Sequence, residues 1–327
     1  MVAKTLIPAA TAMMLLAAAA PAPETRTPET PTPETPTPET PTPETPAPAS
    51  SERAIAGDGT VDATLAGSPG RVRIDPGATG MPIYTAAYAD RARLRGGMIG
   101  FGYAIGPEHV EGATAVTRIG FGAGPVKRRV GWTRRAYAAG VDGVVGPGGL
   151  PDPVVRFTLR PRMPGERTTI LPMVDGGGLF GGRGGLFALI DVGGEPLRIR
   201  FDPWHRRSLA TAGAGVRIAQ ALGGRVIGET GSDEIAFGVE RPTRTIVLET
   251  PLQVGPLALK RLGVRTSDFG NVTAIHEEGD PDEIVVTGKR QRDRSHDRLS
   301  IGSEQLDHCS SIVFDKPAKR ILLSCAA

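Results

Sequence analysis

Apolar positions in this chain come in short alternating runs between glycine-rich turns. The run Arg71-Val-Arg-Ile-Asp75 alternates charged and apolar side chains and stops at an aspartate before a Pro-Gly-Ala turn. Alternation with a period of two predicts a β-strand with one buried face. A similar run, Leu197-Arg-Ile-Arg-Phe-Asp202, also ends at an aspartate followed by proline. We therefore expect two strands that each deliver an aspartate into a tight turn.

Further strands are predicted where other apolar runs lie between Gly or Pro signals. They are a hairpin of 98–105 and 113–121, single strands at 126–132, 141–146, 154–159, 186–190 and 244–249, and a final hairpin of 311–315 and 320–323. The segment 78–94 is expected to be a loop or a short helix. The chain has 44 glycines, and only 5% of its residues are aromatic, which favours turns and short strands over long helices. The sequence predicts an all-β fold.

Three sequence landmarks occur twice and in the same order. Besides the two Asp-Pro turns, a run beginning Gly124-Pro is echoed by one beginning Gly255-Pro, and an apolar strand closed by Gly146 is echoed by one closed by Gly302. The last echo comes late, which we attribute to a polar insertion at about 271–298. Landmarks repeated in one order indicate an internal duplication.

The start of the chain differs in composition from the rest. Residues 1–20 join Lys4 to an apolar run ending in alanines, which is typical of a secretory signal peptide and short for a membrane span. Residues 21–52 repeat Pro, Thr and Glu and predict an extended linker. Two β lobes, 53–172 and 173–327, are expected to follow. We expect a periplasmic or secreted protein without a transmembrane segment after signal removal.

Cysteine usage agrees with export. The two cysteines of the chain, Cys309 and Cys325, flank the final predicted hairpin. An even pair in an exported protein indicates one disulfide, and two buried free thiols are the alternative.

Other classes of function find little support. The net charge of +3 is weak evidence for a nucleic-acid partner, and we expect none. The five histidines show no paired metal-ligand spacing, so no metal or cofactor is expected. The chain also lacks a Gly-x-Ser-x-Gly nucleophile motif and the Lys-Ser/Thr ending of a phosphate-binding loop.

The ordered motifs resemble those of aspartic proteases of the pepsin and retropepsin superfamily. The family signature is an apolar pair followed by Asp-Thr/Ser-Gly-Ala, then an apolar-apolar-Gly strand, and finally a strand hairpin. Ile74-Asp-Pro-Gly-Ala-Thr79 matches with Pro76 in place of Thr, Asp142-Gly-Val-Val-Gly146 looks like the first apolar-apolar-Gly element, and Ile301-Gly302 looks like the second. The resemblance covers roughly residues 60–325 and implies a two-lobed all-β fold.

The same resemblance implies a catalytic pair, Asp75 and Asp202. Two carboxylates at close range share one proton, so that the ionised one activates water while the protonated one polarises the peptide carbonyl. The partner would be a peptide or protein substrate. Substrate contacts would come from Gly77, Ala78, Thr79, Tyr103 and Trp204, with Tyr103 at a hairpin tip over the cleft.

The chain departs from the family pattern in both turns. Pro76 and Pro203 have neither the hydroxyl of Thr or Ser nor an N–H, and Trp204 stands where the family has Gly. The alternative is therefore a catalytically inactive peptide-binding or envelope interaction protein. We expect His205 to be an ordinary turn side chain.

A further motif, Asp282-Glu-Ile-Val-Val-Thr-Gly-Lys-Arg290, is similar to the segment that opens the plug of outer-membrane TonB-dependent receptors. No plug sequence follows this motif, so we do not expect the chain to be such a receptor. The segment is either a docking strand for an envelope protein partner or an ordinary edge strand.

Overall fold

The computed structural model describes residues 52–122, 124–177, 184–268, 270–271, 275–277 and 296–326. The predicted signal peptide, nearly all of the predicted linker, most of the predicted insertion and the whole of 282–290 lie outside these ranges. The described chain is mostly β-strand with a few short helices, which confirms the all-β prediction.

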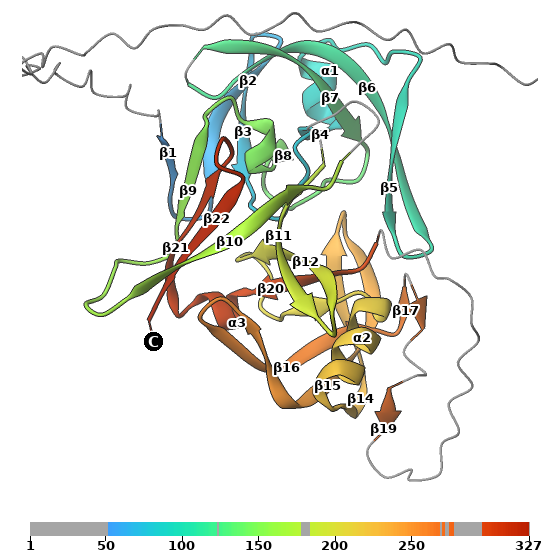
Figure 1. The fold of residues 1–327 in the computed structure, drawn as a ribbon. Coiled ribbons are helices and arrows are strands. Elements are labelled where there is room, and N and C mark those ends of the chain that lie inside the picture. Colours follow the sequence, from blue (N-terminus) through green and yellow to red (C-terminus); the bar gives the residue numbers. More distant parts are fainter. Residues whose placement is uncertain are drawn as a thin grey trace, which may run out of the picture. The chain divides into compact units, whose positions relative to one another are not determined.

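Seven strands of the first half form one sheet. They are β2 (Thr60–Leu65), β3 (Ser68–Ile74), β4 (Ile83–Thr85), β5 (Gly100–Ile105), β6 (Glu108–Gly120), β7 (Pro125–Thr133) and β8 (Gly143–Val145). Their order is β2-β3-β8-β4-β7-β6-β5, and β2 also pairs with β6, so the sheet closes on itself (Figure 1). The β3–β8 and β4–β7 pairs are parallel, whereas the others are antiparallel. The predicted hairpin of 98–105 and 113–121 corresponds to β5 and β6.

The second sheet carries the rest of the fold. Its strands are β1 (Glu52–Ile55), β9 (Val154–Thr158), β10 (Arg167–Asp175), β11 (Leu186–Val192), β12 (Glu195–Asp202), β13 (Leu209–Ala210), β14 (Gly224–Ala236), β15 (Val239–Val254), β16 (Leu257–Arg265), β19 (His276–Glu277), β20 (Arg298–Gly302), β21 (Cys309–Asp315) and β22 (Arg320–Cys325). A small ladder joins β17 (Ser267–Asp268) to β18 (Gly270–Asn271). The large sheet runs β1-β9-β21-β22-β10-β11-β12-β20-β13-β16-β15-β14-β19.

Part of this second sheet repeats the pairing order of the first. The run β11-β12-β20-β13-β16-β15-β14 has the same succession of parallel and antiparallel pairs as β2-β3-β8-β4-β7-β6-β5. A helix follows the same strand in each run, α1 (Ala86–Arg91) after β4 and α2 (Ala212–Leu222) after β13. A helical turn also follows β8 and β20, as η1 (Pro147–Gly149) and α3 (Ser303–Leu306). An internal duplication would produce this order, and the duplication itself stays a prediction.

The C-terminal hairpin holds the second sheet to earlier parts of the chain. β21 pairs with β9 and β22 pairs with β10, while β10 continues the sheet into β11. The predicted boundary between residues 172 and 173 therefore falls inside β10, and the division into two lobes stays a prediction. Cys309 and Cys325 lie opposite each other on β21 and β22, fully buried, with their sulfur atoms 2.10 Å apart. The predicted disulfide is confirmed.

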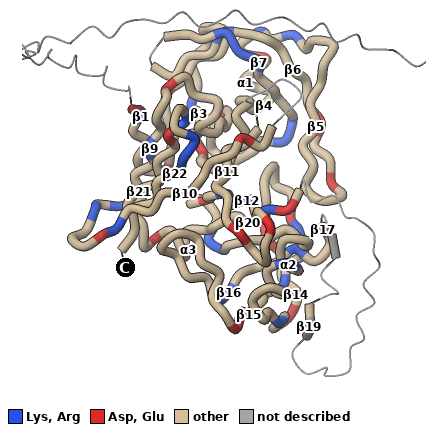
Figure 2. The backbone as a smooth tube through the Cα atoms, viewed as in Figure 1, with Lys and Arg blue, Asp and Glu red and all other residues tan. Residues whose placement is uncertain are grey.

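Basic and acidic positions are interspersed along the described elements (Figure 2). The apolar residues form one large buried cluster and a smaller second one. The smaller cluster mixes residues from both halves, among them Ile105 and Tyr137 from the first half and Phe237 from the second. The two halves therefore share this cluster, while the last apolar residues of β3 and β12, Ile74 and Phe201, both belong to the large one.

Candidate active site

The first aspartate lies in a tight turn at the end of β3. The backbone N–H of Asp75 donates to the carbonyl of Val145 at 3.0 Å, which extends the parallel pairing of β3 with β8 by one residue. The N–H of Ala78 donates back to the Asp75 carbonyl at 3.0 Å and closes the turn, whose second position is Pro76. The N–H of Gly77 donates to Oδ1 of Asp75 at 2.7 Å, so a backbone dipole faces the carboxyl.

The second aspartate lies in an equivalent turn. Asp202 is the last residue of β12 and is paired with Gly302 of the parallel strand β20. The N–H of His205 donates to the Asp202 carbonyl at 3.2 Å, and Pro203 again occupies the second position. Both aspartates are buried, at 4% exposed for Asp75 and 3% for Asp202. Two Asp-Pro turns thus end two strands that occupy equivalent places, because β3 pairs in parallel with β8 and β12 pairs in parallel with β20.

Arg200 links the two turns. One of its terminal nitrogens donates to Oδ2 of Asp202 at 2.7 Å, and this ion pair is buried. Its Nε lies so close to Gly77 that a Cβ there would overlap it. Because the Gly77 N–H binds Asp75, the guanidinium lies directly between the two carboxyl-bearing turns. Glycine at position 77 is required by this close approach.

The two carboxyls influence each other, and their pKa values differ widely. Burial, together with the negative charge of Asp202, raises the pKa of Asp75 to about 6. Burial alone would also raise the pKa of Asp202, but the charge of Arg200 and the contact with His205 lower it to about 2. Between these values the pair holds one proton, which resides on Asp75.

His205 is the other cationic partner of Asp202. Its Nδ1 lies 2.9 Å from Oδ1 of Asp202, an ion-pair distance without the alignment of a hydrogen bond. This contact raises the pKa of His205, although partial burial acts in the opposite direction. Both oxygens of Asp202 therefore face a cationic group at acid pH.

Aromatic side chains from both halves pack beside the dyad. The ring of Tyr103, on β5, lies 6.1 Å from that of Tyr137 and 5.2 Å from that of Phe237, at the turn between β14 and β15. Tyr137 and Phe237 are 4.9 Å apart, and the Phe237 N–H donates to the Tyr137 carbonyl. These contacts tie the β5–β6 hairpin of the first half to the β14–β15 hairpin of the second.

Two cavities are lined by residues that contact the aspartates. A cavity of about 500 Å³ is lined by Gly77, Thr79 and Tyr103 from the first half and by Arg200 from the second, among other residues. A space of about 10 Å³ is lined by Asp202, Arg200 and His205, and it has room for about one water molecule. Asp202 therefore lines the water-sized space, whereas the larger cavity is lined by Gly77 and Arg200, which bind Asp75 and Asp202, and not by the aspartates themselves.

The structure brings together some of the residues expected to contact substrate and separates others. Gly77, Thr79 and Tyr103 line the larger of these two cavities. Ala78 is buried in the smaller apolar cluster. Trp204 points elsewhere, because its ring lies 5.6 Å from the Arg73 guanidinium and close to Gly59.

Two residues of the site were missed by sequence reasoning. Arg200 is two positions before Asp202 on β12, so strand alternation puts the two side chains on one face. That spacing was visible in the sequence but has no counterpart in the family resemblance that points to the dyad. His205 was expected to be an ordinary turn residue, yet the turn brings its ring to the carboxyl of Asp202.

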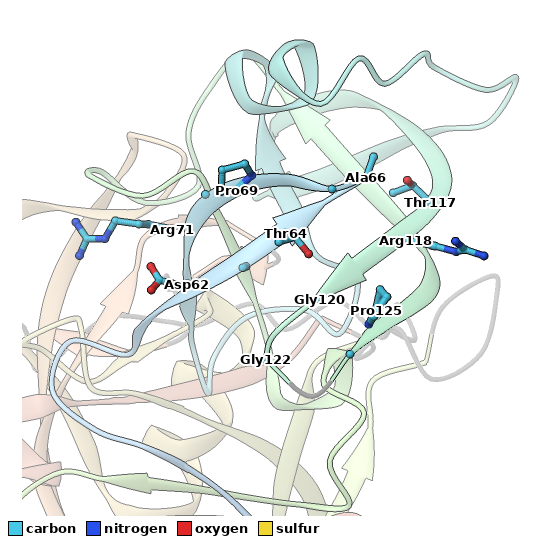
Figure 3. Close-up of a pocket in the computed structure, with 14 residues that line it drawn as sticks. Asp62, Thr64, Ala66, Pro69, Arg71, Thr117, Arg118, Gly120, Gly122 and Pro125 are labelled. Atoms are coloured by element: carbon cyan, nitrogen blue, oxygen red, sulfur yellow. The ribbon is translucent and has the colours of Figure 1, made fainter.

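A wider cavity, of about 1130 Å³, lies between the β2–β3 hairpin and the β6–β7 hairpin (Figure 3). It is lined by small and apolar residues, with Asp62, Arg71 and Arg118 as its only charged lining residues in the described chain. It shares no lining residue with the two cavities at the dyad. The large volume of this cavity is therefore weaker evidence for an active site than the chemistry of the dyad.

No protein-family model and no curated protein matches the chain. Within the described ranges, no helix is long and apolar enough to cross a membrane. Across the same residues, no three His, Cys, Asp or Glu side chains gather as the ligands of a metal ion would.

Proposed function

We propose that this chain is an exported aspartic-peptidase-like hydrolase whose catalytic pair is Asp75 and Asp202. The observation that carries the proposal is the convergence of two buried aspartates at the ends of equivalently paired strands, with one guanidinium between them. Carboxyls whose environments drive their pKa values apart are the usual arrangement for general acid–base work. The repeated strand order supports a two-lobed fold built by internal duplication.

The split titration assigns a role to each carboxyl. Asp75, with a pKa of about 6, keeps its proton at acid pH and would donate a hydrogen bond to the peptide carbonyl. Asp202, with a pKa of about 2, is ionised over the same range and would accept a proton from water as that water attacks. The space of about 10 Å³ beside Asp202 is large enough for that water.

Arg200 favours a second candidate, a peptide-binding protein without catalysis. A carboxylate held by a buried guanidinium is a weaker base than a free one, and Pro76 and Pro203 lack the hydroxyl that the family uses at this position. On this alternative a peptide would occupy the cavity of about 500 Å³ without being cleaved.

The buried disulfide supports export, because disulfides persist in oxidising compartments. A periplasmic or secreted location is therefore part of the proposal. Protein or peptide substrates met in that compartment would be the partners. Release of the chain from bacterial cells by osmotic shock would test the location.

Cleavage of a quenched fluorescent peptide library tests the function. We expect cleavage at acid pH that is inhibited by pepstatin and nearly abolished in both Asp75→Asn and Asp202→Asn, because the two groups act as a unit. Asp62→Asn, on the exposed side of β2, is the matched control and should cleave like wild type. Equal cleavage by wild type and the double Asn variant would end the catalytic proposal. Peptide binding without cleavage by any variant would favour the second candidate.

A further inference from the structure

The cavity of about 500 Å³ that Gly77 and Arg200 line is strongly basic. Three of its lining side chains are arginines, namely Arg198, Arg200 and Arg298, and Tyr103 and Phe187 contribute aromatic walls. No acidic side chain lines it among the residues that the structure describes. We call these five residues the basic subsite.

Strand pairing explains why the arginines gather there. Arg198 and Arg200 are two positions apart on β12 and therefore share a face of the sheet. Arg298, on the parallel strand β20, is the register partner of Arg198. Like charges on neighbouring strands repel each other, so this arrangement favours the binding of an anion between them.

Two arginines of the subsite, Arg200 and Arg298, each have a donor that is not used within the described chain. Nε of Arg298 and Nε of Arg200 are both buried without a hydrogen-bond partner in the described chain. A guanidinium offers paired donors that match the two oxygens of a carboxylate. Buried donors of this kind favour a partner that arrives with the ligand.

The aromatic side chains of the subsite also lie close to the positive charges of the arginines. Burial would raise the pKa of Tyr103, but the charges of Arg200 and Arg298 lower it below the ordinary tyrosine value. Phe187 faces the Arg198 guanidinium, which lies 6.0 Å from the ring centre. The walls are therefore suited to the apolar stem of a side chain whose end is anionic.

We propose that the basic subsite binds a carboxylate of the peptide substrate next to the bond that is cleaved. The inference rests on the proposed function, because the subsite borders Asp75 through Gly77 and Asp202 through Arg200. The carboxylate can come from a Glu or Asp side chain or from the C-terminus of the peptide.

Binding of uncleavable peptides to the full chain tests the proposal without needing turnover. Fluorescently labelled peptides with a reduced central bond would carry Glu or Gln beside that bond, with an amidated C-terminus, and a third peptide would carry Gln with a free C-terminus. We expect at least one carboxylate peptide to bind about tenfold more tightly than the amidated Gln peptide at pH 5, as measured by anisotropy. Preference for Glu assigns the side chain, and preference for the free C-terminus assigns the chain end.

Variants locate the effect. Arg298→Gln should remove most of the preference, whereas Arg118→Gln, an exposed arginine on β6, should leave it unchanged. Equal or undetectable binding of all three peptides by wild type would overturn the subsite. The readout is binding, so the two proposals can fail separately. If the protein cleaves peptides but does not prefer those with a carboxylate, the subsite proposal is wrong and the hydrolase proposal stands. If it prefers carboxylate peptides but cleaves none, the hydrolase proposal is wrong and the subsite proposal stands.

Discussion

The burial of Asp75 destabilises the folded chain above acid pH. Its pKa is raised from 3.8 to about 6, so below 3.8 the carboxyl is neutral in the folded and the unfolded chain alike. Above pH 3.8 the unfolded chain releases this proton, whereas the folded chain keeps it until the pH reaches about 6. The free energy of unfolding therefore falls as the pH rises from 3.8 through 6.

Asp75→Asn should remove this penalty while keeping an oxygen for the Gly77 N–H. We expect the free energy of unfolding of the variant, relative to wild type, to increase by about 2 kcal/mol between pH 4 and pH 8. Urea unfolding at the two pH values measures it. If the difference in the free energy of unfolding between variant and wild type stays constant with pH, folding does not change the pKa of Asp75.

Arg200 sets the charge of Asp202. Burial opposes ionisation of Asp202, and the Arg200 guanidinium overcomes that effect to lower its pKa to about 2. Replacing Arg200 with Met should therefore raise the pKa of Asp202 and move the acid limb of the pH–activity profile to higher pH, while Arg200→Lys should keep part of the wild-type position. The measurement is kcat/KM against pH for the three proteins. An acid limb that does not move would mean that Arg200 has no part in placing the proton.

Among the secondary-structure elements, β8 and β20 play the same part in the two halves. A glycine at the end of each, Gly146 directly after β8 and Gly302 as the last residue of β20, packs against the turn following an aspartate. A Cβ on Gly146 would overlap the carbonyl of Ala78, and one on Gly302 would lie 2.5 Å from the carbonyl oxygen of Arg206. Neither backbone neighbour can rotate away as a side chain would. The apolar-apolar-Gly motif is thus explained by close backbone approach.

Gly146→Ala and Gly302→Ala should each lower the free energy of unfolding by about 2 kcal/mol, because backbone must shift to admit the methyl group. Gly102→Ala, on β5, is the control, since no atom lies within 4 Å of the position that a Cβ would take there and its φ is not positive. Urea midpoints for the three variants decide the matter. If Gly302→Ala were as stable as wild type, the packing described for β20 would be wrong.

Sequence pattern predicted most elements that alternate cleanly. β3, β12 and the final hairpin were expected at nearly their observed positions. β14 was not, because Gly224–Ala236 is rich in Gly and polar residues and its pairing with β15 shifts register between Ile227 and Gly231. α2 was missed because Gly213 and Gly215 lower helix propensity, and the helix forms where Gly215 packs closely against Val264. These elements depend on tertiary contacts.

The candidate site was predicted only in part for the same reason. Asp75 and Asp202 could be found because each stands at the end of an apolar strand, and Tyr103 because it lies in an arm of the predicted hairpin, on β5. The ion pair of Arg200 with Asp202 was not predicted, since strand alternation gives a shared face but not which partner a long side chain will reach. The position of Trp204 against Arg73 depends on packing between distant segments.

For the whole molecule, the C-terminal hairpin is the element that ties early and late strands into one sheet. The disulfide joins its two strands across a sequence separation of 16. Closing a loop of that size restricts the unfolded chain and should stabilise the fold by about 3 kcal/mol. The double variant Cys309→Ala with Cys325→Ala should lose about that much.

Urea unfolding of this variant beside oxidised wild type measures the loss. Reduced wild type is the matched control, because it breaks the same bond without changing any side chain in the hairpin core. Unfolding midpoints that coincide in all three samples would contradict a stabilising role for the bond.

The pH dependence of kcat/KM for peptide cleavage shows whether Asp75 and Asp202 work as a pair that shares one proton, as we propose. We expect a bell-shaped profile, with activity rising as Asp202 ionises at a pH of about 2 and falling as Asp75 loses its proton at about 6. Activity that continues undiminished to pH 8 would contradict the account, because Asp75 would then be ionised and unable to donate a hydrogen bond to the substrate carbonyl.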